Sequence, residues 1–289
     1  MKKAYFKYIA ALLLFGSNGV VASHICLSSY YIVLLRTLIG SVFLLLLFCF
    51  TKNRFSFYKY PKDCVFILIS GIAMGICWMF LYEAYDMVGV SVSSLLYYCG
   101  PIIVMVLSPI LFKEKFTSEK FISFIMVFIG VFLVNGQAAN ELSIWGITCG
   151  CFSAVMYSIM VIANKKTKSI TGIENSLIQL FVSFLTVAVF VGIKNKGYMI
   201  EIQTVDWLWI CIFGIFNTGI GCYFYFSSIG ELSVQTVAVC GCLELLSAVC
   251  FSFVFLNETM TVLQVVGAIL IIAGVIFGEN FRKSKISMN

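Results

Sequence analysis

One acidic side chain stands in the middle of an apolar stretch near the end of the chain. Glu244 lies halfway along residues 233–255, which contain no other charged residue. A carboxyl near the centre of a bilayer costs roughly 2.5–3.5 kcal/mol on insertion scales, and such groups usually face a bundle interior or a water-filled cavity. Glu244 is therefore a candidate for binding a substrate or for exchanging a proton. The alternative is a buried neutral acid with a structural hydrogen bond.

The helix face around Glu244 consists of small and apolar residues. By i,i+3 and i,i+4 spacing, this face contains Val237, Cys240, Gly241, Ser247, Ala248 and Phe251. Small side chains beside a carboxyl leave room for water or a ligand, and they equally allow close packing of a neighbouring helix. The face is compatible with both interpretations of Glu244.

Two polar residues lie inside apolar stretches of the first half. Arg36 is placed toward the outer end of its stretch, where a long cation can extend to the interface or pair with Glu83 of the next stretch. Such a pair would form a gate or a carboxylate-binding corner at the outer mouth. Asn18 is a candidate substrate contact, and a hydrogen bond to another helix is the alternative.

Aromatic side chains are numerous, and a few of them are placed to line a cavity. The chain has 28 Phe, 14 Tyr and 4 Trp, so most must face lipid or fill the core. Binding cavities combine aromatic walls with a few polar groups. Judged by their spacing, the aromatic candidates are Trp78, Tyr82, Tyr98 and Tyr223, and the polar candidate beside them is Asn217. With Glu244, Asn18 and Arg36, they form the predicted substrate site.

The elements that must hold these residues follow from the composition. Of the 289 residues, 61% are hydrophobic and 11% are charged, and the mean hydropathy is +1.04. A soluble domain has about 45–50% apolar and about 25% charged residues, so the sequence predicts an integral membrane protein. The net charge of +6 comes from short basic loops and requires no nucleic acid partner.

Signatures of catalysis are lacking. The single histidine, His24, falls in a predicted loop, and nearly all of the 12 cysteines lie inside apolar stretches, where Cys behaves as a small hydrophobe. The sequence contains no paired-carboxylate motif, no metal-ligand cluster and no phosphate-binding glycine loop. We expect no enzymatic activity, no metal and no cofactor.

Ten apolar stretches have about the length that a bilayer requires of a helix. The predicted spans are 8–23, 30–50, 64–84, 91–112, 121–137, 144–164, 176–193, 207–229, 233–255 and 262–278. Helices are the only open-ended elements that can span a bilayer. The stretches are therefore predicted to be helices joined by short loops.

Lys and Arg are concentrated in alternate connections. If both termini lie inside, the inner segments contain Lys2, Lys3, Lys7, Lys52, Arg54, Lys59, Lys62, Lys113, Lys115, Lys120, Lys165, Lys166, Lys168, Arg282, Lys283 and Lys285. The outer loops contain Lys194 and Lys196 only. Because positive charge accumulates on the cytoplasmic side, we expect a multi-pass protein of the cytoplasmic membrane with both termini in the cytoplasm.

The second half of the chain repeats the first. At an offset of 144 residues, the matching pairs are Gly75 with Gly219, Val90 with Val234, Glu114 with Glu258, Thr117 with Thr261 and Gly130 with Gly274. Each unit, 1–137 and 138–289, contains five predicted spans, and this odd number inverts the second unit in the membrane. Inverted repeats are typical of secondary transporters, whose substrate binds between the halves. A duplicated membrane protein without transport activity is the alternative.

Short motifs in both halves resemble those of a known family. They are Glu83-Ala84-Tyr85, Ser93-Ser94-Leu95, Gly100-Pro101, Phe112-Lys113-Glu114-Lys115-Phe116-Thr117, Leu243-Glu244 and Leu256-Asn257-Glu258-Thr259-Met260-Thr261. Together they resemble the EamA family of the drug/metabolite transporter superfamily, over nearly the whole chain. The resemblance implies ten helices in two inverted halves around a central cavity, and transport of small organic solutes, often outward.

One position departs from the family pattern. The family commonly has Leu-Glu-Pro in the ninth span, whereas Leu245 follows Glu244 here; Pro101 retains the proline of the fourth span. Proline frees a backbone carbonyl and permits a kink. We therefore expect the ninth span to be straighter than the fourth.

The sequence thus predicts an all-α, polytopic integral membrane protein with ten transmembrane helices in two inverted five-helix repeats. We expect a secondary transporter that exports a small amphipathic metabolite, such as a zwitterion, by alternating access with proton coupling through Glu244. Its predicted partners are the lipid bilayer, the substrate and protons. The alternatives are an uncoupled facilitator of a cationic solute and a non-transporting scaffold or sensor.

Overall fold

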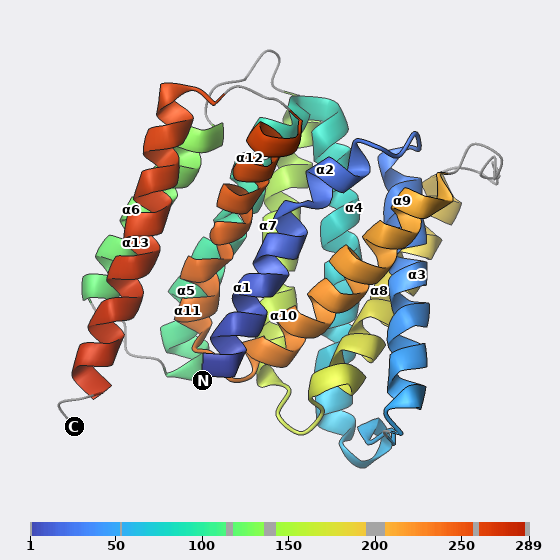
Figure 1. Ribbon diagram of the computed structural model, residues 1–289. Coiled ribbons are helices and arrows are strands. Elements are labelled where there is room, and N and C mark those ends of the chain that lie inside the picture. Colours follow the sequence, from blue (N-terminus) through green and yellow to red (C-terminus); the bar gives the residue numbers. More distant parts are fainter. Residues whose placement is uncertain are drawn as a thin grey trace.

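The protein is a bundle of helices (Figure 1). The computed structural model describes residues 2–52, 54–113, 118–135, 143–194, 206–256 and 260–286. In this part of the chain the elements are α1 (Lys2–Gly16), α2 (Asn18–Ala22), α3 (Ser29–Phe50), the 3-10 helix η1 (Phe57–Lys59), α4 (Pro61–Tyr97), α5 (Cys99–Phe112), α6 (Ser118–Asn135), α7 (Ile144–Lys166), α8 (Gly172–Lys194), α9 (Trp207–Ile212), the π-helix η3 (Phe213–Ile220), α10 (Gly221–Ile229), α11 (Val234–Gly241), α12 (Leu243–Phe255) and α13 (Val262–Ile286).

Most of these helices are long and apolar enough to cross a bilayer. Eight segments qualify: Lys2–Ala22, Ser29–Phe50, Pro61–Val90, Val92–Phe112, Ile144–Lys166, Gly172–Lys194, Trp207–Ile229 and Val234–Phe255. A shorter apolar helix covers Val262–Phe277, and α6 packs along it. Large apolar side chains such as Phe50, Ile110 and Val262 are exposed on the surface, as expected where the surrounding solvent is lipid. The prediction of an all-α polytopic membrane protein is confirmed.

The two halves run through the bundle in opposite senses. The start of α1 and the end of α13 lie at the lower end in Figure 1, together with the segments that follow α3, α7 and α10. We call this the basic end, because Lys7, Lys59 and Lys165 lie there. The first half begins with α1 at the basic end, whereas the second half begins with α7 at the opposite end. The second half is therefore inverted relative to the first.

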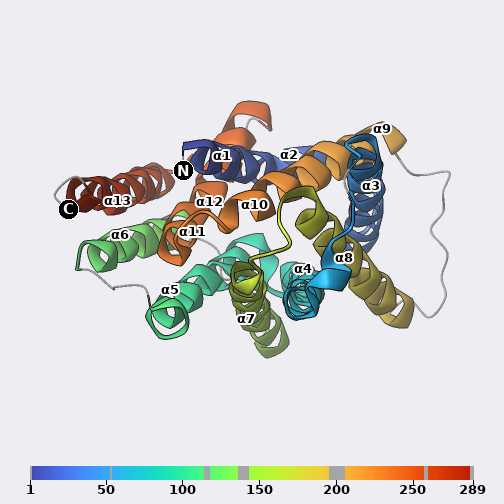
Figure 2. The ribbon, with the colours of Figure 1, turned by 90° about the horizontal axis from the view of Figure 1, so that it is seen from below.

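Helices of the first half pack against helices of the second half. α4 packs against α7 and α8, α1 against α10 and α12, and α6 against α13. A Cβ at Gly71 in α4 would lie 2.7 Å from the carbonyl oxygen of Gln179 in α8, and one at Gly130 in α6 would lie 2.7 Å from that of Gly267 in α13. Figure 2 shows α6 and α13 side by side at one edge of the bundle, with α3 and α8 at the other edge.

The two halves have helix breaks at equivalent positions, 144 residues apart. Tyr98 separates α4 from α5, and Cys242, 144 residues later, separates α11 from α12. The ninth span is therefore interrupted at the position equivalent to the break in the fourth, although it has no proline there. Pro101 explains the first break because it has no N–H to donate. At the second break, the Tyr8 hydroxyl donates a 2.8 Å hydrogen bond to the carbonyl of Val237, and a side chain inserted among the backbone hydrogen bonds bends a helix without proline.

Candidate functional site

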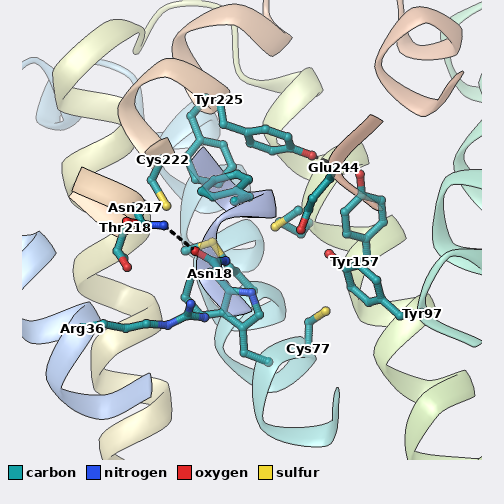
Figure 3. Close-up of a pocket in the computed structure, with 15 residues that line it drawn as sticks. Asn18, Arg36, Cys77, Tyr97, Tyr157, Asn217, Thr218, Cys222, Tyr225 and Glu244 are labelled. Carbon is teal, nitrogen blue, oxygen red and sulfur yellow. Dashed lines mark hydrogen bonds between the residues drawn. The ribbon is translucent and has the colours of Figure 1, made fainter. Parts of the chain in front are cut away.

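A cavity of about 620 Å³ lies between the two halves. Residues at the end of the bundle opposite the basic end, such as Ser29, Asp86 and Gln264, line its mouth. Its deeper part meets a smaller pocket, and Asn18, Arg36 and Glu244 line both. Figure 3 shows this deeper region, where side chains from several helices converge. The cavity is thus accessible from one end of the bundle and reaches the middle of the membrane-spanning part.

Glu244 lies in the first turn of α12, directly after the break at Cys242. A helix N-terminus favours a negative charge, so the break creates a suitable place for this carboxylate. Its side chain is half-buried and points into the pocket (Figure 3). Among the described residues, none donates a hydrogen bond to the carboxylate and no cation forms an ion pair with it. The carboxylate is therefore free to contact whatever enters the cavity.

The repeat explains why only one half carries this charge. The counterpart of Glu244 at the 144-residue offset is Gly100. A Cβ at Gly100 would lie 2.7 Å from the Tyr157 ring and 3.0 Å from the carbonyl oxygen of Ala154. Packing of α7 against α5 therefore leaves no room for an acidic side chain at this position.

Four tyrosines cluster on the side of the deeper pocket that faces the basic end; three of them line the pocket, and Tyr8 packs behind Tyr225. The Tyr157 and Tyr225 hydroxyls lie 3.1 Å apart and share a hydrogen bond. The ring centroid of Tyr225 lies 5.4 Å from that of Tyr8, and the ring centroid of Tyr157 lies 5.3 Å from that of Tyr97. Tyr8, Tyr157 and Tyr225 are buried. We call Tyr8, Tyr97, Tyr157 and Tyr225 the tyrosine floor, because they separate Glu244 from the basic end.

Arg36 faces the same cavity as Glu244. Its side chain is only 4% exposed, and its Nε atom is buried without a hydrogen-bond partner. The guanidinium carbon lies 4.5 Å from the ring centroid of Trp78 and 5.0 Å from that of Phe213. Both sequence-based expectations for Arg36, extension to the interface and pairing with Glu83, are therefore wrong. The aromatic rings hold the guanidinium inside the bundle by cation–π contacts.

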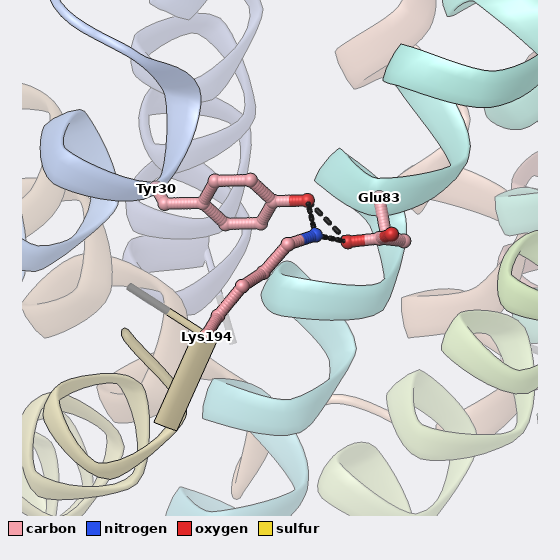
Figure 4. A network of polar contacts seen from close by, with 3 residues as sticks. All are labelled: Tyr30, Glu83 and Lys194. Carbon is pink, nitrogen blue, oxygen red and sulfur yellow. Dashed lines mark hydrogen bonds and ion pairs between the residues drawn. The ribbon is translucent and has the colours of Figure 1, made fainter. Parts of the chain in front are cut away.

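Glu83 has a different cationic partner. Lys194, the last residue of α8, forms an ion pair and a hydrogen bond with the Glu83 carboxylate, and its Nζ atom donates a 2.7 Å hydrogen bond to the Tyr30 hydroxyl. The same hydroxyl donates to Glu83. Figure 4 shows these three side chains converging from α3, α4 and α8. The end of α8 supplies a cation at the depth of Glu83, so Arg36 is not needed there.

Asn18 and Asn217 join the first span to the eighth. The Asn217 Nδ2 group donates to the carbonyl of Leu14 at 2.7 Å, to Ser17 Oγ at 2.8 Å and to Asn18 Oδ1 at 3.1 Å. Ser17 is where α1 ends and α2 begins, so the amide satisfies backbone and side-chain acceptors at a helix break. Both asparagines also line the deeper pocket.

The predicted aromatic wall is present in part. Trp78, Tyr82 and Tyr98 line the cavity. Tyr223 is not among the residues that line the cavity or the smaller pocket; its ring instead lies 5.2 Å from the Lys7 Nζ atom. Tyr225 takes that place. Tyr223 lies six residues after Asn217, short of the roughly 7.2 residues of two α-helical turns, so even α-helical spacing turns it away from the Asn217 face. A π-helical turn contains more residues than an α-helical one, so η3 moves that face further along the chain, to Tyr225.

Several lining residues were missed by the sequence-based prediction. They are Cys77, Tyr97, Tyr157, Thr218, Cys222 and Tyr225. The signal that pointed to Glu244, a polar side chain inside an apolar span, applies equally to Tyr157 and Thr218. Many lipid-facing and core residues carry the same signal, so it does not select these positions without knowledge of their neighbours.

Two inverted membrane-spanning halves around a central polar cavity are the architecture of a multi-pass membrane transporter. The model of the EamA-like transporter family matches the chain twice, over residues 2–136 and 144–278. The chain belongs to this family, which confirms the resemblance seen in the sequence motifs.

Similar proteins agree with this class, and a solved structure agrees with the fold. The chain is 24% identical over 277 residues to "Uncharacterized transporter YxxF" of Bacillus subtilis (strain 168), covering 94% of this chain and 88% of that protein. It is 25% identical over 297 residues to "Uncharacterized transporter YetK" of the same organism, covering 94% and 85%. A crystal structure with 15% identity superposes with a TM-score of 0.82, covering 98% of this chain and 99% of that chain, and it supports the fold alone.

Proposed function

We propose that this transporter moves a small amphipathic metabolite, such as a zwitterion, and that Glu244 binds either the substrate or a proton. The observation that carries this proposal is the Glu244 carboxylate, which faces a cavity between the halves and has no partner among the described residues. A carboxylate held near the bilayer centre without a structural partner is retained at a cost. A role in binding a cationic group or a proton explains why the carboxylate is present despite this unfavourable free energy.

Alternating access accounts for a cavity whose described lining reaches the end of the bundle opposite the basic end. The tyrosine floor closes the basic end, and Lys165 of α7 donates hydrogen bonds to the carbonyls of Ile229 and Gly230 at 2.8 and 3.1 Å, which fixes α7 to the segment after α10. If the basic end is cytoplasmic, as its Lys and Arg content favours, this conformation is open to the outside. Transport then requires a second conformation in which these contacts separate and the outer mouth closes.

Coupling to protons follows from mutual exclusion at Glu244. A carboxyl can hold a proton or attract a substrate ammonium group, and it cannot do both at once. Entry of a proton from outside would release the substrate there, and loss of that proton to the cytoplasm would prepare Glu244 for the next substrate. This sequence exports the substrate at the expense of a proton gradient.

The test is transport by purified protein in proteoliposomes. Vesicles loaded with a mixture of the common amino acids are placed in an imposed pH gradient, and the released compounds are measured by mass spectrometry. We expect gradient-driven release with the wild-type chain and its loss in Glu244→Gln, with unchanged thermal unfolding. Undiminished gradient-driven release by Glu244→Gln would refute the role of Glu244, and absence of flux of any supplied metabolite would refute transport of this class.

A cationic solute moved without proton coupling is the competing function. The tyrosines around Glu244 favour it, because aromatic faces attract cations. The Arg36 guanidinium in the same cavity opposes it by repulsion. Flux that follows an imposed membrane potential and ignores an imposed pH gradient would favour the cationic solute.

A further inference from the structure

We propose that Arg36 and Thr218 form a carboxylate-binding subsite across the cavity from Glu244. Both residues line the deeper pocket, and Figure 3 shows them on one side of it, with Glu244 on the other. The role of this subsite in transport rests on the function proposed above, whereas the binding of a carboxylate can be measured without any flux.

The first donor is a buried guanidinium that lacks an anionic partner. Arg36 forms no ion pair within the described part of the chain, and its Nε atom is buried without an acceptor. A buried charge without a partner is strongly unfavourable. Contacts with the Trp78 and Phe213 rings offset part of this cost and fix the plane of the guanidinium. They supply no acceptor for its N–H groups.

The second donor is a hydroxyl that does not follow the usual behaviour of threonine in a helix. Thr37 and Thr186 donate to the carbonyls four residues earlier, at 2.8 and 2.9 Å. The Thr218 hydroxyl is buried and has no hydrogen-bond partner, although the residue is only 2% exposed. Thr218 lies in the π-helix η3, whose i→i+5 hydrogen bonding displaces the carbonyl that such a threonine would use.

Two unsatisfied hydrogen-bond donors in one pocket indicate which ligand group could bind there. A guanidinium presents N–H groups in a planar fork that matches the two oxygens of a carboxylate, and a hydroxyl can complete the coordination of one oxygen. With Glu244 on the opposite side, the cavity then holds the carboxylate of a zwitterion at Arg36 and Thr218 and its ammonium group at Glu244. The separation of positive and negative charge across the cavity thereby matches the separation of charges in a zwitterion.

The probe is benzoate, with neutral isosteric benzamide as the control ligand. Trp78 lies against the Arg36 guanidinium, so its fluorescence reports on the subsite. The chain has 4 tryptophans, and a variant carrying Trp145→Phe, Trp207→Phe and Trp209→Phe retains Trp78 alone. In detergent, we expect benzoate to quench the fluorescence of Trp78 saturably and benzamide not to. Over the same range of concentrations, benzoate should stabilise the wild-type chain against thermal unfolding.

Substitutions then assign the binding to the two donors. Thr218→Val removes the hydroxyl at nearly constant volume and is expected to weaken benzoate about tenfold, the effect of one hydrogen bond to a charged group. Thr218→Ser restores the hydroxyl and should recover most of the affinity. Arg36→Lys keeps the charge but loses the planar fork, and we expect at least a tenfold loss, about 1.4 kcal/mol.

Each outcome decides the assignment. No saturable effect of benzoate, equal effects of benzoate and chloride, or equal affinity in wild-type protein and Thr218→Val would overturn the subsite. These results would leave gradient-driven flux and its dependence on Glu244 untouched. Conversely, benzoate binding that depends on Arg36 and Thr218, in a protein that moves no metabolite, would retain the subsite and refute the transport proposal.

Discussion

Two groups of charged residues on the described helices of this bundle are arranged in opposite ways. Toward the end of the bundle opposite the basic end, Glu83 is paired with Lys194 and hydrogen-bonded to Tyr30; we call these three residues the outer group. Deeper in the cavity, Glu244 and Arg36 line one pocket without forming an ion pair. The outer group satisfies its own charges, whereas the inner charges are held apart by the positions of α3 and α12.

This contrast separates structural charges from charges available to a ligand. A paired group has already regained, through its partner, part of the free energy lost on leaving water, so a solute gains little by replacing that partner. An unpaired group regains it only when a solute or a proton arrives. The depth of a charged residue in the membrane is therefore a weaker guide to its role than the presence of a partner.

The largest expected difference between the two groups is in flux. Glu244→Gln should lower transport of a zwitterionic substrate by roughly a hundredfold, since a lost charge-assisted contact of about 2–3 kcal/mol corresponds to that factor. The matched control Glu83→Gln should change flux less than about twofold. Initial rates in proteoliposomes measure both. A larger loss in Glu83→Gln than in Glu244→Gln would reverse the assignment of roles.

Stability should respond in the opposite order. Glu83→Gln leaves the Lys194 ammonium with a weaker partner, and we expect the free energy of unfolding to fall by about 1 kcal/mol, because Lys194 is 38% exposed and partly screened. Glu244→Gln removes a carboxylate without a partner, so stability should be unchanged or higher. Unfolding by titration with SDS provides the comparison. Destabilisation by Glu244→Gln alone would indicate a structural acid.

A double-mutant cycle makes the contrast quantitative. Glu83→Gln combined with Lys194→Met should show a coupling of roughly 0.5–1 kcal/mol, as expected for a partly exposed pair. Glu244→Gln combined with Arg36→Gln should show less coupling, because these side chains form no ion pair. Stronger coupling between Glu244 and Arg36 than between Glu83 and Lys194 would mean that the charges in the cavity already neutralise each other.

The smallest effect is expected for the neutral member of the outer group. Tyr30→Phe removes the hydroxyl that donates to Glu83 and accepts from Lys194. The ion pair remains, so the loss of stability should be about 0.5 kcal/mol, with unchanged flux. A change in flux without a change in stability would indicate that the outer group acts as a gate.

The sequence was a good guide to features that depend on local composition and on counting. Each of the ten predicted spans corresponds to a helical segment of the structure. Glu244 could be located near the middle of its span because hydropathy and charge are read along one segment. The inverted arrangement followed from an odd number of spans in each half, which requires no knowledge of packing.

The rotation of each helix about its axis and the partners of each side chain could not be predicted from the sequence. Tyr223 was expected in the cavity, but it lies short of two full α-helical turns after Asn217, and the π-helix η3 shifts the cavity face further, to Tyr225. Glu83 was paired with Arg36 because both stood toward the outer ends of neighbouring spans, whereas the end of α8 brings Lys194 closer. A straighter ninth span was expected from a missing proline, but the helix is interrupted at Cys242, close to the Val237 carbonyl that Tyr8 of a distant segment binds.

The sequence by itself determined the class of the protein, its spans, the inversion of its halves and the presence of a carboxyl near the membrane centre. These properties depend on the transfer of residues from water to lipid, which each segment undergoes largely on its own. Only the tertiary structure decided which charges are paired, which tyrosines close the cavity and that Arg36 and Thr218 lack acceptors. Partners come from segments far apart in the chain, and the rotation of each helix is set by what packs against it.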